Sequence, residues 1–308
     1  MKCKKCQKDA IAFLRYANIK LCEEHFAEFY EKRVKKFCES RKLVNPGEKL
    51  LVAISGGKDS TACLHALARI FPGKNELVGF YINLGIGYEG YSDEGQRICE
   101  ENCKKIGIDF HPFNLKKEYG FGVEDIRLKR RICSDCGRIK RYVTNKVAYD
   151  LGCDKAVLGH NLDDEIAFLL INMAAGSLLQ MERTGPATET NRSLKLVGRI
   201  KPLYLCTEKD DMLYCESIGA KYYHSYCPYG QNITQHVFKQ AMNHIEDSSA
   251  CTKIRLMNSF LEKIKPLIPK QEVVVKACTR CGMPTTLDVC SFCKLVERQQ
   301  GKTAENRE

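Results

Sequence analysis

The sequence predicts an α/β fold in which helices cover both faces of a parallel sheet, with a small metal-binding module at each end. Two observations predict the sheet. Short β-rich segments alternate with helical patterns through the middle of the chain, and a glycine-containing loop, SGGKDS, follows the first of these strands. Paired cysteines near both termini predict the modules. We expect domain boundaries that divide the chain into residues 1–28, 29–270 and 271–308.

Each end of the chain offers four metal ligands in two closely spaced pairs. Two intervening residues let both side chains of a pair reach one tetrahedral ion from a tight turn, and such an ion can fold a segment too short to bury its own core. Ordinary buried cysteines are the alternative. We expect two structural zinc sites, with the ligands Cys3, Cys6, Cys22 and His25 in one and Cys278, Cys281, Cys290 and Cys293 in the other.

The elements of the central region follow in order along the chain. Apolar and β-branched runs predict strands, and longer amphipathic stretches predict the helices between them. The expected strands are 50–54, 76–84, 109–115 and 155–161, and the expected helices are 58–70, 92–106, 137–151 and 164–175. Residues 176–205 are polar and predict an irregular loop. Helical patterns return at 207–218 and 234–264, and the prolines at 266 and 269 predict a linker into the last module.

The loop SGGKDS, Ser55 to Ser60, has the composition of a phosphate-binding turn. Gly56 and Gly57 let the backbone approach an anion closely, the following helix N-terminus adds partial positive charge, and Lys58 adds a full charge. A Walker loop needs Ser or Thr directly after its Lys, so Asp59 excludes that class. Because Asp59 would repel bare phosphate, it indicates a nearby Mg²⁺ ion or a helix cap.

A second polar motif, GHNLDDE, follows the strand at 155–161 and is expected at the same sheet edge. Asp163 and Asp164 have an ordinary interpretation as caps of the next helix, and Asp163 fits that role best. We interpret His160 as a neutral side chain bonded to backbone in preference to a catalytic group. Gly159 would let the adenine or ribose of a nucleotide approach.

The stretch RLKRRICSDCGRIKR, residues 127–141, carries seven basic residues and one acid around a cysteine pair. Cys133 and Cys136 alone cannot close a metal site, and Cys227, which precedes a proline, is the candidate third ligand of an iron–sulfur cluster. A redox dithiol is the alternative for the pair. Most of the other eight cysteines fit core or partly buried positions, and we assign no metal to Cys99 and Cys103.

Composition narrows the function classes. The formal net charge of +11 favours an anionic partner such as nucleic acid, although a solvated basic surface is the alternative. The start of the chain has no apolar signal-peptide core, and the longest apolar run, residues 167–175, is too short for a bilayer. We therefore expect a cytoplasmic protein with no membrane partner, whose 18 cysteines serve metal or sulfur chemistry instead of disulfides.

In order along almost the whole chain, these motifs resemble the TtuA-type tRNA 2-thiouridine synthetases of the PP-loop ATP pyrophosphatase superfamily. The resemblance implies that ATP adenylates the C2 carbonyl oxygen of a tRNA uridine, releasing pyrophosphate, and that sulfur then displaces AMP. It implies a [4Fe–4S] cluster on Cys133, Cys136 and Cys227, and catalytic roles for Lys140, Asp164 and Asp59. The implied ATP-binding residues are Ala53, Ser55, Gly56, Gly57, Lys58, Asp59, Ser60, Tyr81 and Gly159.

The resemblance further implies two Zn²⁺ ions, Mg²⁺, a homodimer, and sulfide or a ubiquitin-like thiocarboxylate protein as sulfur donor. It leaves the wobble and T-loop uridines open as substrates. Two rival functions also stay open. One is a PP-loop enzyme that adds a nucleophile other than sulfur to RNA, and the other is a zinc-bearing RNA-binding protein without catalysis.

Overall fold

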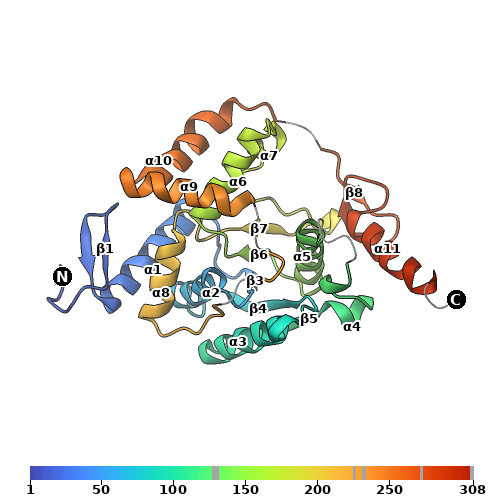
Figure 1. Cartoon of the computed structure of the whole chain (residues 1–308), viewed down its shortest axis with the longest axis horizontal. Helices are drawn as coiled ribbons and strands as arrows, with labels where there is room; N and C mark the ends of the chain where they lie inside the picture. The colour runs from blue at the N-terminus through green and yellow to red at the C-terminus, as the bar shows by residue number, and fades with distance from the viewer. Residues whose placement is uncertain (127–131, 225–226, 231–233, 271–272, 306–308) are drawn as a thin grey trace.

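The computed structural model describes residues 1–126, 132–224, 227–230, 234–270 and 273–305, with side chains to residue 301. Its centre is a five-stranded parallel sheet (Figure 1). The sheet order is β5-β4-β3-β6-β7, and the strands are β3 Lys49–Ala53, β4 Glu76–Asn83, β5 Asp109–Asn114, β6 Lys155–Leu158 and β7 Gly198–Ile200. The chain reverses its direction of winding between β3 and β6, so a crevice forms beyond the carboxyl ends of these two strands.

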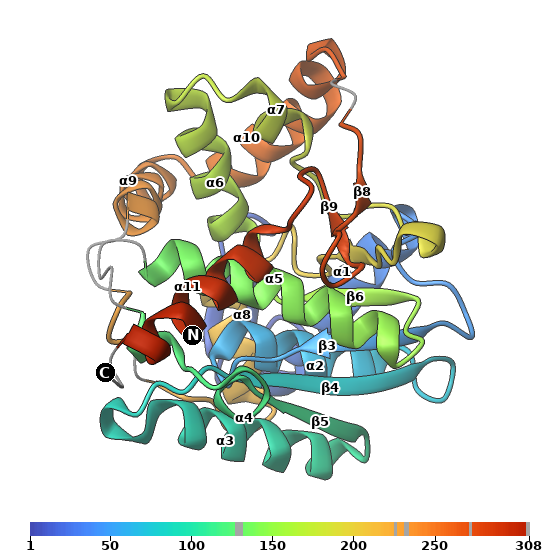
Figure 2. The ribbon, with the colours of Figure 1, turned by 90° about the vertical axis from the view of Figure 1, so that its right-hand side faces the viewer.

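Helices cover both faces of the sheet, as the alternating pattern predicts. On one face lie α1 Glu23–Ser40, α2 Lys58–Ile70, α3 Tyr91–Ile106 and α8 Glu208–Ser217. The opposite face is covered by α5 Ile132–Asp150, with α4 Leu115–Tyr119 beside it (Figure 2). Successive side chains of β3 lie on opposite faces of the sheet: Leu50 and Val52 belong to one core cluster and Leu51 to the other. Neither face of β3 is therefore exposed to water.

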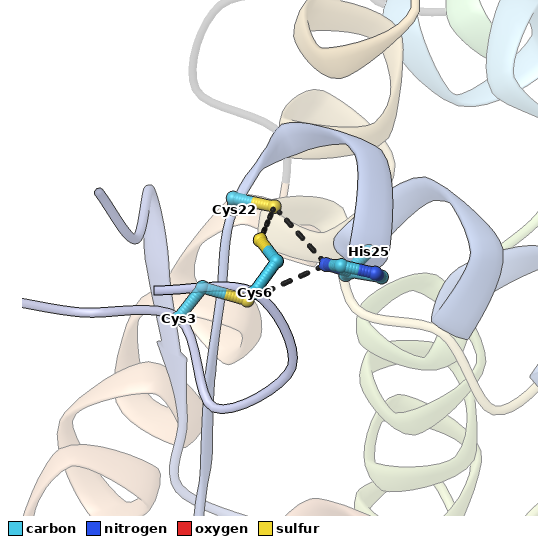
Figure 3. A group of neighbouring side chains, drawn as sticks. All are labelled: Cys3, Cys6, Cys22 and His25. Atoms are coloured by element: carbon cyan, nitrogen blue, oxygen red, sulfur yellow. Dashed lines mark hydrogen bonds between the residues drawn. The ribbon is translucent and has the colours of Figure 1, made fainter. Parts of the chain in front are cut away.

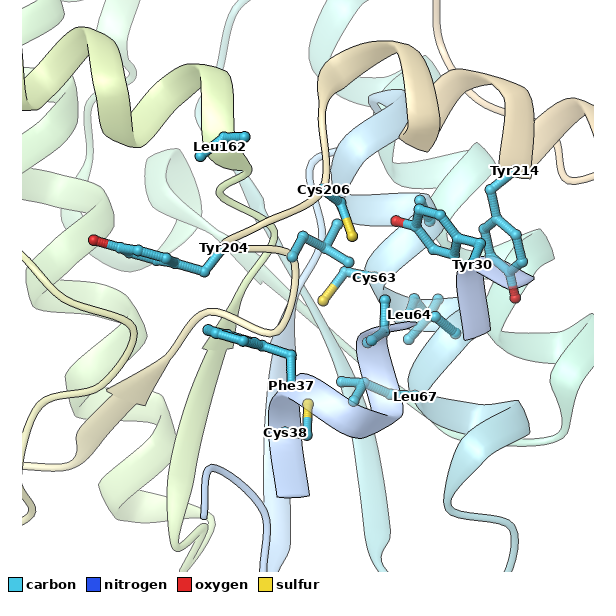
Figure 4. Close-up of a cluster of buried hydrophobic side chains, with 14 of the residues drawn as sticks. Tyr30, Phe37, Cys38, Cys63, Leu64, Leu67, Leu162, Tyr204, Cys206 and Tyr214 are labelled. Atoms are coloured by element: carbon cyan, nitrogen blue, oxygen red, sulfur yellow. The ribbon is translucent and has the colours of Figure 1, made fainter. Parts of the chain in front are cut away.

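The core between α1, α2 and α8 is aromatic and rich in cysteine (Figure 4). Tyr30 and Tyr214 stack with ring centroids 4.3 Å apart, and Phe37 stacks on Tyr204 at 6.1 Å. Seven of the eight cysteines without an assigned ligand role are buried, as expected; the eighth, Cys251, is half-buried. Cys103 also explains why β4 carries Gly79, since a Cβ at Gly79 would lie 2.3 Å from the Cys103 sulfur.

Beyond the strand ends, a helical layer stands over the crevice (Figure 1). It contains α6 Leu162–Ala174, α7 Leu178–Glu182, α9 Thr234–Ser248 and α10 Thr252–Ser259, followed by a π-helical turn Phe260–Ile264 and a 3₁₀ turn Lys265–Leu267. The expected helical segment 234–264 is helical in the structure, and it is divided between α9 and α10 at Cys251, which adopts a left-handed conformation with φ of 68°. Glu246 caps this break by accepting hydrogen bonds from the amides of Cys251 and Lys253.

The expected irregular segment 176–205 also needs correction, because it contains α7, a 3₁₀ turn Arg192–Leu194 and the edge strand β7. Three residues are too few to show a period, so sequence patterning could not separate β7 from the loop around it. Helix α5 begins at Ile132, five residues before the expected start, which places the Cys133 and Cys136 pair inside its first turns. The remaining expected boundaries agree with the structure to within three residues.

The two ends of the chain form small modules on opposite sides of the molecule (Figure 1). The first is the hairpin of β1 Ala12–Leu14 and β2 Ile19–Leu21, which leads into α1. The second is the pair β8 Lys276–Ala277 and β9 Pro284–Thr285, followed by α11 Ser291–Glu305, which packs beside α5. In the described part of the chain, no helix combines the length and apolar character needed to cross a bilayer.

Candidate active site

The loop between β3 and α2 is shaped to receive an anion. The hydroxyl of Ser60 accepts a hydrogen bond from the Ser55 amide at 3.0 Å and donates one to the Gly57 carbonyl at 3.1 Å, which closes the turn on itself. Gly57 is the N-cap of α2, and within the described part of the chain no side-chain cap is present at this helix start. Amides at this helix start are consequently free for a ligand, and the helix dipole favours a negative one.

Of the two glycines predicted to permit close approach, Gly56 lies against protein backbone, whereas Gly57 does not. Gly56 has a φ of 82°, and a Cβ there would lie 3.2 Å from Gly95 of α3. Gly95 itself lies against the Tyr81 ring, whose buried hydroxyl donates to the Ser92 carbonyl at 2.8 Å. The Tyr81 side chain thus supports α3 behind the loop, and its hydroxyl is already engaged within the protein.

Gly159 joins the two halves of the crevice. A Cβ at this position would lie 2.8 Å from the Ser60 Cα and 3.2 Å from the Asp59 carbonyl carbon. The end of β6 therefore touches the backbone of the phosphate loop directly. The glycine is required by this contact, in addition to the nucleotide approach expected for it.

A group of carboxylates surrounds Lys58 at the start of α2. Lys58 Nζ lies 3.2 Å from Asp59 and 3.7 Å from Glu208. Oxygen Oδ1 of Asp59 is buried and has no hydrogen-bond partner among the residues that the structure describes. Burial raises the pKa of Asp59, the Lys58 charge opposes that rise, and the charges of Asp164 and Glu208 add to it. The negative charges of Asp59, Asp164 and Glu208 outnumber the positive charge of Lys58, so this group can accommodate a further cation.

Lys239 of α9 contacts two of these carboxylates. Its Nζ lies 2.5 Å from Asp164 and 2.7 Å from Glu208, while the Gln235 amide donates to Asp164 at 3.1 Å. Burial lowers the pKa of Lys239, but the two carboxylates outweigh this effect and raise it. Sequence reasoning missed Glu208 and Lys239, because neither stands in a recognisable motif; Glu208 reaches the site from the start of α8 and Lys239 from α9 of the helical layer.

Helix α6 begins with a capping box that includes Asp164 and not Asp163. Asn161 is the N-cap and accepts from the Asp164 amide at 3.1 Å, and Asp164 Oδ2 accepts from the Asn161 amide at 3.4 Å. The interpretation of Asp163 as a cap is wrong. Its carboxylate pairs with Lys253 of α10 and accepts from the Glu208 amide at 2.8 Å, so it ties α6 to the helices beyond the sheet.

His160 also differs from its expected environment. Its Nδ1 lies 3.2 Å from the buried Glu165 carboxylate, and no bond to backbone is present among the described residues. Lys201 approaches both oxygens of Glu165 at 2.8 Å. Burial raises the pKa of Glu165, but the contacts with His160 and Lys201 outweigh burial and lower it below the ordinary 4.5. Glu165 is therefore an ionised structural anchor in this part of the fold.

The three central cysteines lie on two segments that are distant in the sequence and in contact in the fold. Cys136 on α5 has both Cys133 and Cys227 as electrostatic neighbours. Burial raises the pKa of its thiol, Lys140 opposes the rise, and the other two cysteines add to it. The Cys133 thiol donates to the Tyr229 carbonyl at 3.1 Å, which fixes the Cys-Pro segment against α5. Four of the seven basic residues of this stretch, within 127–131, lie outside the described residues.

One main-chain hydrogen bond connects this cysteine group to the phosphate loop. The Tyr223 amide donates to the Gly56 carbonyl at 2.7 Å, four residues before Cys227. Tyr223 also packs edge-on against Tyr91 of α3 at 5.4 Å. The segment that carries Cys227 is thus anchored on the loop, and the anion site and the cysteines share one edge of the sheet.

Both terminal groups have the geometry of a metal site. In each, the four ligand atoms lie within 4.8 Å of one another. His25 Nδ1 is 3.5 Å from the Cys3 sulfur and 3.3 Å from the Cys22 sulfur (Figure 3). Burial opposes ionisation of Cys3, but the backbone amides of Cys22, Lys5 and Cys6 outweigh it and lower the pKa to about 6. Thiolate and imidazole ligands in this number suit Zn²⁺.

Comparison with known proteins agrees with this geometry. Residues 26–244 match the PP-loop domain family, and residues 2–27 match the N-terminal LIM domain of the 2-thiouridine synthetase TtuA. The chain is 37% identical over 295 residues to the tRNA-5-methyluridine(54) 2-sulfurtransferase of Pyrococcus horikoshii, covering 96% of this chain and 93% of that one. It is also 37% identical to the enzyme of the same name from Thermotoga maritima, over 98% and 99% of the two chains.

The chain belongs to the family of TtuA-type tRNA 2-thiouridine synthetases. A solved structure of similar fold is the U34-tRNA thiolase NcsA of Methanococcus maripaludis with its [4Fe–4S] cluster. That chain is 27% identical, with a TM-score of 0.82 over 97% of this chain and 96% of its own.

Membership of the TtuA-type family confirms the resemblance and the fold class inferred from the motifs. The residue assignments within the site stay predictions, but the structure shows where each lies. The loop residues Ser55 to Ser60, Asp164 and the cysteines of α5 lie around the crevice, and Cys227 reaches it through the Tyr223 contact. The site residues expected from the sequence did not include Tyr223. Its position four residues before the Cys227–Pro228 pair is the feature of the sequence that could have identified it.

Proposed function

We propose that this protein is a tRNA uridine 2-sulfurtransferase acting on uridine 54 of the T-loop. The observation that carries the proposal is the hydrogen bond from Tyr223 to Gly56, because it joins an ATP site and a three-cysteine site at one sheet edge. The T-loop position is supported by the relatives named for uridine 54, which at 37% identity are closer than the 27% identical thiolase named for uridine 34. A tRNA substrate supports the cytoplasmic location expected from the sequence.

The first chemical step is activation of the uridine. The C2 carbonyl oxygen attacks the α-phosphorus of ATP, the bond to pyrophosphate breaks, and an O-adenylated base forms. The free amides after Gly57 and the charge of Lys58 would stabilise the pyrophosphate as it leaves. Mg²⁺ bound with ATP would be held by Asp59, whose Oδ1 is buried without a partner, and Asp164. This ion would neutralise part of the negative charge of the phosphates.

The second step replaces oxygen by sulfur. Hydrosulfide attacks C2, the bond from C2 to the AMP oxygen breaks, and loss of the sulfur-bound proton leaves a C2 thiocarbonyl. A [4Fe–4S] cluster held by Cys133, Cys136 and Cys227 would supply an iron site that carries the sulfur nucleophile. The three thiols fit such a group because they come from two segments fixed together by the Tyr229 carbonyl. Lys140 would polarise the uridine carbonyl or balance charge beside them.

Two Zn²⁺ ions in the terminal groups would hold the modules folded, because each group presents four ligand atoms and leaves no open position. The sulfur donor is free sulfide or the C-terminal thiocarboxylate of a ubiquitin-like protein, and the protein acts as a homodimer. Supplying each donor separately to the purified protein distinguishes the two sources, and light scattering of the holoprotein measures the oligomeric state.

The experiment uses anaerobically purified protein with ATP, sulfide and a tRNA transcript. We expect pyrophosphate release that depends on tRNA and, by nucleoside mass spectrometry, one uridine with sulfur in place of oxygen. A transcript with cytidine at position 54 should lose the product, and one with cytidine at position 34 should retain it. The reverse pattern would move the substrate to the wobble position. Pyrophosphate release without sulfur incorporation would favour another nucleophile, and no release would favour an RNA-binding protein.

A further inference from the structure

A cavity of about 290 Å³ lies away from the crevice, between α5, the edge strand β7 and the C-terminal module. Three arginines line this cavity: Arg138 and Arg141 from α5, and Arg199 from β7. On α5 these side chains are not on the face of the cysteines: Cys136 and Lys140 are one turn apart on one side, and Arg138, Arg141 and Asn145 follow at helical spacing on another. The cavity is therefore a separate site.

The positive charge of this cavity is only partly neutralised. Arg138 pairs with the buried Asp135 at 2.5 Å. Within the described part of the chain, no carboxylate lies within ion-pair distance of Arg141 or Arg199. Burial lowers the pKa of Arg141 with a further contribution from the Arg138 charge, and burial lowers the pKa of Arg199 with a contribution from Arg141. Three like charges thus face one space, and an anion between them would offset both desolvation and repulsion.

The third wall supplies neutral donors in a fixed position. Thr285, Thr286 and Ser291 line the cavity from the C-terminal module, and Ser291 begins the fifteen-residue helix α11. Phe292 stacks on Tyr142 of α5 with centroids 3.9 Å apart and an interplanar angle of 10°, which clamps the module to the catalytic core. Hydroxyls, guanidinium groups and a helix N-terminus that converge in this way match the oxygens of a phosphate.

We propose that the Arg138, Arg141 and Arg199 cavity binds a backbone phosphate of the tRNA while the target uridine occupies the crevice on the other side of α5. The choice of RNA as the source of the phosphate rests on the proposed function. A phosphate is favoured over a nucleobase, because the aromatic rings at the cavity already stack on each other. Its role is to position the tRNA by a contact that does not depend on sequence.

The test replaces both unpaired arginines, as Arg141→Gln/Arg199→Gln, in the full-length holoprotein. The matched control is Arg97→Gln/Lys104→Gln on the outer side of α3, which removes the same formal charge elsewhere. Binding of fluorescent tRNA is measured by anisotropy over a salt series. We expect about a tenfold weaker Kd for the cavity variant and a slope of log K against log salt smaller by about one, as for loss of one phosphate contact. The control should retain most of the wild-type affinity.

Further measurements separate a positioning role from damage to the fold. Arg141→Lys/Arg199→Lys keeps the charge, so it should restore the salt slope while losing the bidentate geometry. At saturating tRNA the Gln variant should retain the wild-type kcat, with the KM for tRNA raised by the same factor as Kd. Wild-type Kd and salt slope in the Gln variant would overturn the proposal, even where the wild-type protein thiolates tRNA. Failure of the wild-type protein to thiolate would overturn the proposed function alone.

The source of the phosphate is resolved by calorimetric titration with inorganic phosphate and with AMP in the absence of RNA. We expect neither to show binding that depends on Arg141 and Arg199 at millimolar concentration, because one phosphate alone gains too few contacts. Binding of either that disappears in the Gln variant, with an unchanged affinity for tRNA, would assign the cavity to a free phosphate compound and overturn the RNA assignment.

Discussion

Lys140 lies one helical turn after Cys136, and its charge acts on that thiol. At the same sheet edge, Asp59 keeps a buried oxygen without a partner while Lys58 and Lys239 balance the carboxylates around it. Single side chains in this protein therefore divide into those that handle phosphate charge and those that face the cysteines. A substitution in one set should spare the function of the other.

Replacing Lys140 by Ala should abolish thiolation, with a loss of at least about a hundredfold in rate as for removal of one preorganised charged group. ATP binding should be unchanged, because Lys140 is not part of the phosphate loop. Single-turnover thiolation and ATP titration measure the two effects, and the cluster absorbance checks cofactor loading. Lys146→Ala, further along α5 and paired with Asp150 on the surface, is the matched control. Full turnover by Lys140→Ala would contradict the assignment.

Glu165 has a lowered pKa, which predicts how the stability of the protein depends on pH. Its folded-state pKa is lowered, so its contribution to stability is present above the unfolded pKa and is lost as the pH falls through the folded value. Glu165→Gln leaves Lys201 without its buried carboxylate and should lower the free energy of unfolding by roughly 3 kcal/mol at pH 7.

Urea denaturation of the holoprotein at several pH values tests this. The difference from wild type should shrink as the pH falls below the ordinary carboxylate pKa of 4.5. The exposed pair of Glu94 with Arg97 provides the control, and Glu94→Gln should change stability by no more than about 0.5 kcal/mol. A Glu165→Gln deficit that is constant across this pH range would show that the effect is packing alone.

Among the elements, local signals predicted the central strands and helices, and neighbouring elements decided the exceptions. Helix α2 spans Lys58–Ile70 as its pattern predicts. The predicted helical segment 234–264 is divided into two helices at Cys251, because Glu246 accepts hydrogen bonds from the amides of Cys251 and Lys253 and so stabilises a left-handed residue that is not glycine. β7 exists because β6 offers it a pairing edge, a reason absent from its own three residues.

Gly159→Ala tests the contact between the end of β6 and the start of α2. An added Cβ would meet the Ser60 backbone at 2.8 Å, so the two elements must separate, and we expect a destabilisation of about 1–3 kcal/mol together with weaker ATP binding. Thermal unfolding and ATP titration measure both. Gly301→Ala, in α11 with no atom of the described side chains and backbone within 4 Å, is the control and should be neutral or slightly stabilising. Normal ATP affinity in Gly159→Ala would show that the loop tolerates the shift.

At the scale of the whole molecule, the terminal modules flank a nucleotide-binding core from opposite sides (Figure 1). The C-terminal module is attached through the stacking of Phe292 on Tyr142, and it completes the arginine cavity. On the proposed function, zinc binding at that end would be coupled to RNA binding through this cavity, whereas the phosphate loop is supported by the sheet, by α3 and by the Tyr223 amide.

Cys293→Ser should therefore remove one zinc ion per chain and weaken tRNA binding severalfold, because the module loses its metal-dependent structure and with it the third wall of the cavity. ATP binding should persist. Elemental analysis, tRNA anisotropy and ATP titration give the three readings. Cys251→Ser, which replaces a half-buried cysteine outside the ligand groups, is the control. Unchanged zinc content in Cys293→Ser would exclude the proposed ligand set.

The sequence by itself determined the features that depend on neighbouring residues. Strand and helix periods, the SGGKDS turn and the cysteine pairs each follow from local spacing, and together they were sufficient to identify the family. Only the tertiary structure decided which distant side chains meet. Lys239 reaches Asp164 across 75 residues, Tyr223 reaches Gly56, and Arg199 joins Arg141 beside the C-terminal module. Such encounters depend on sheet order and helix packing, which no local pattern encodes.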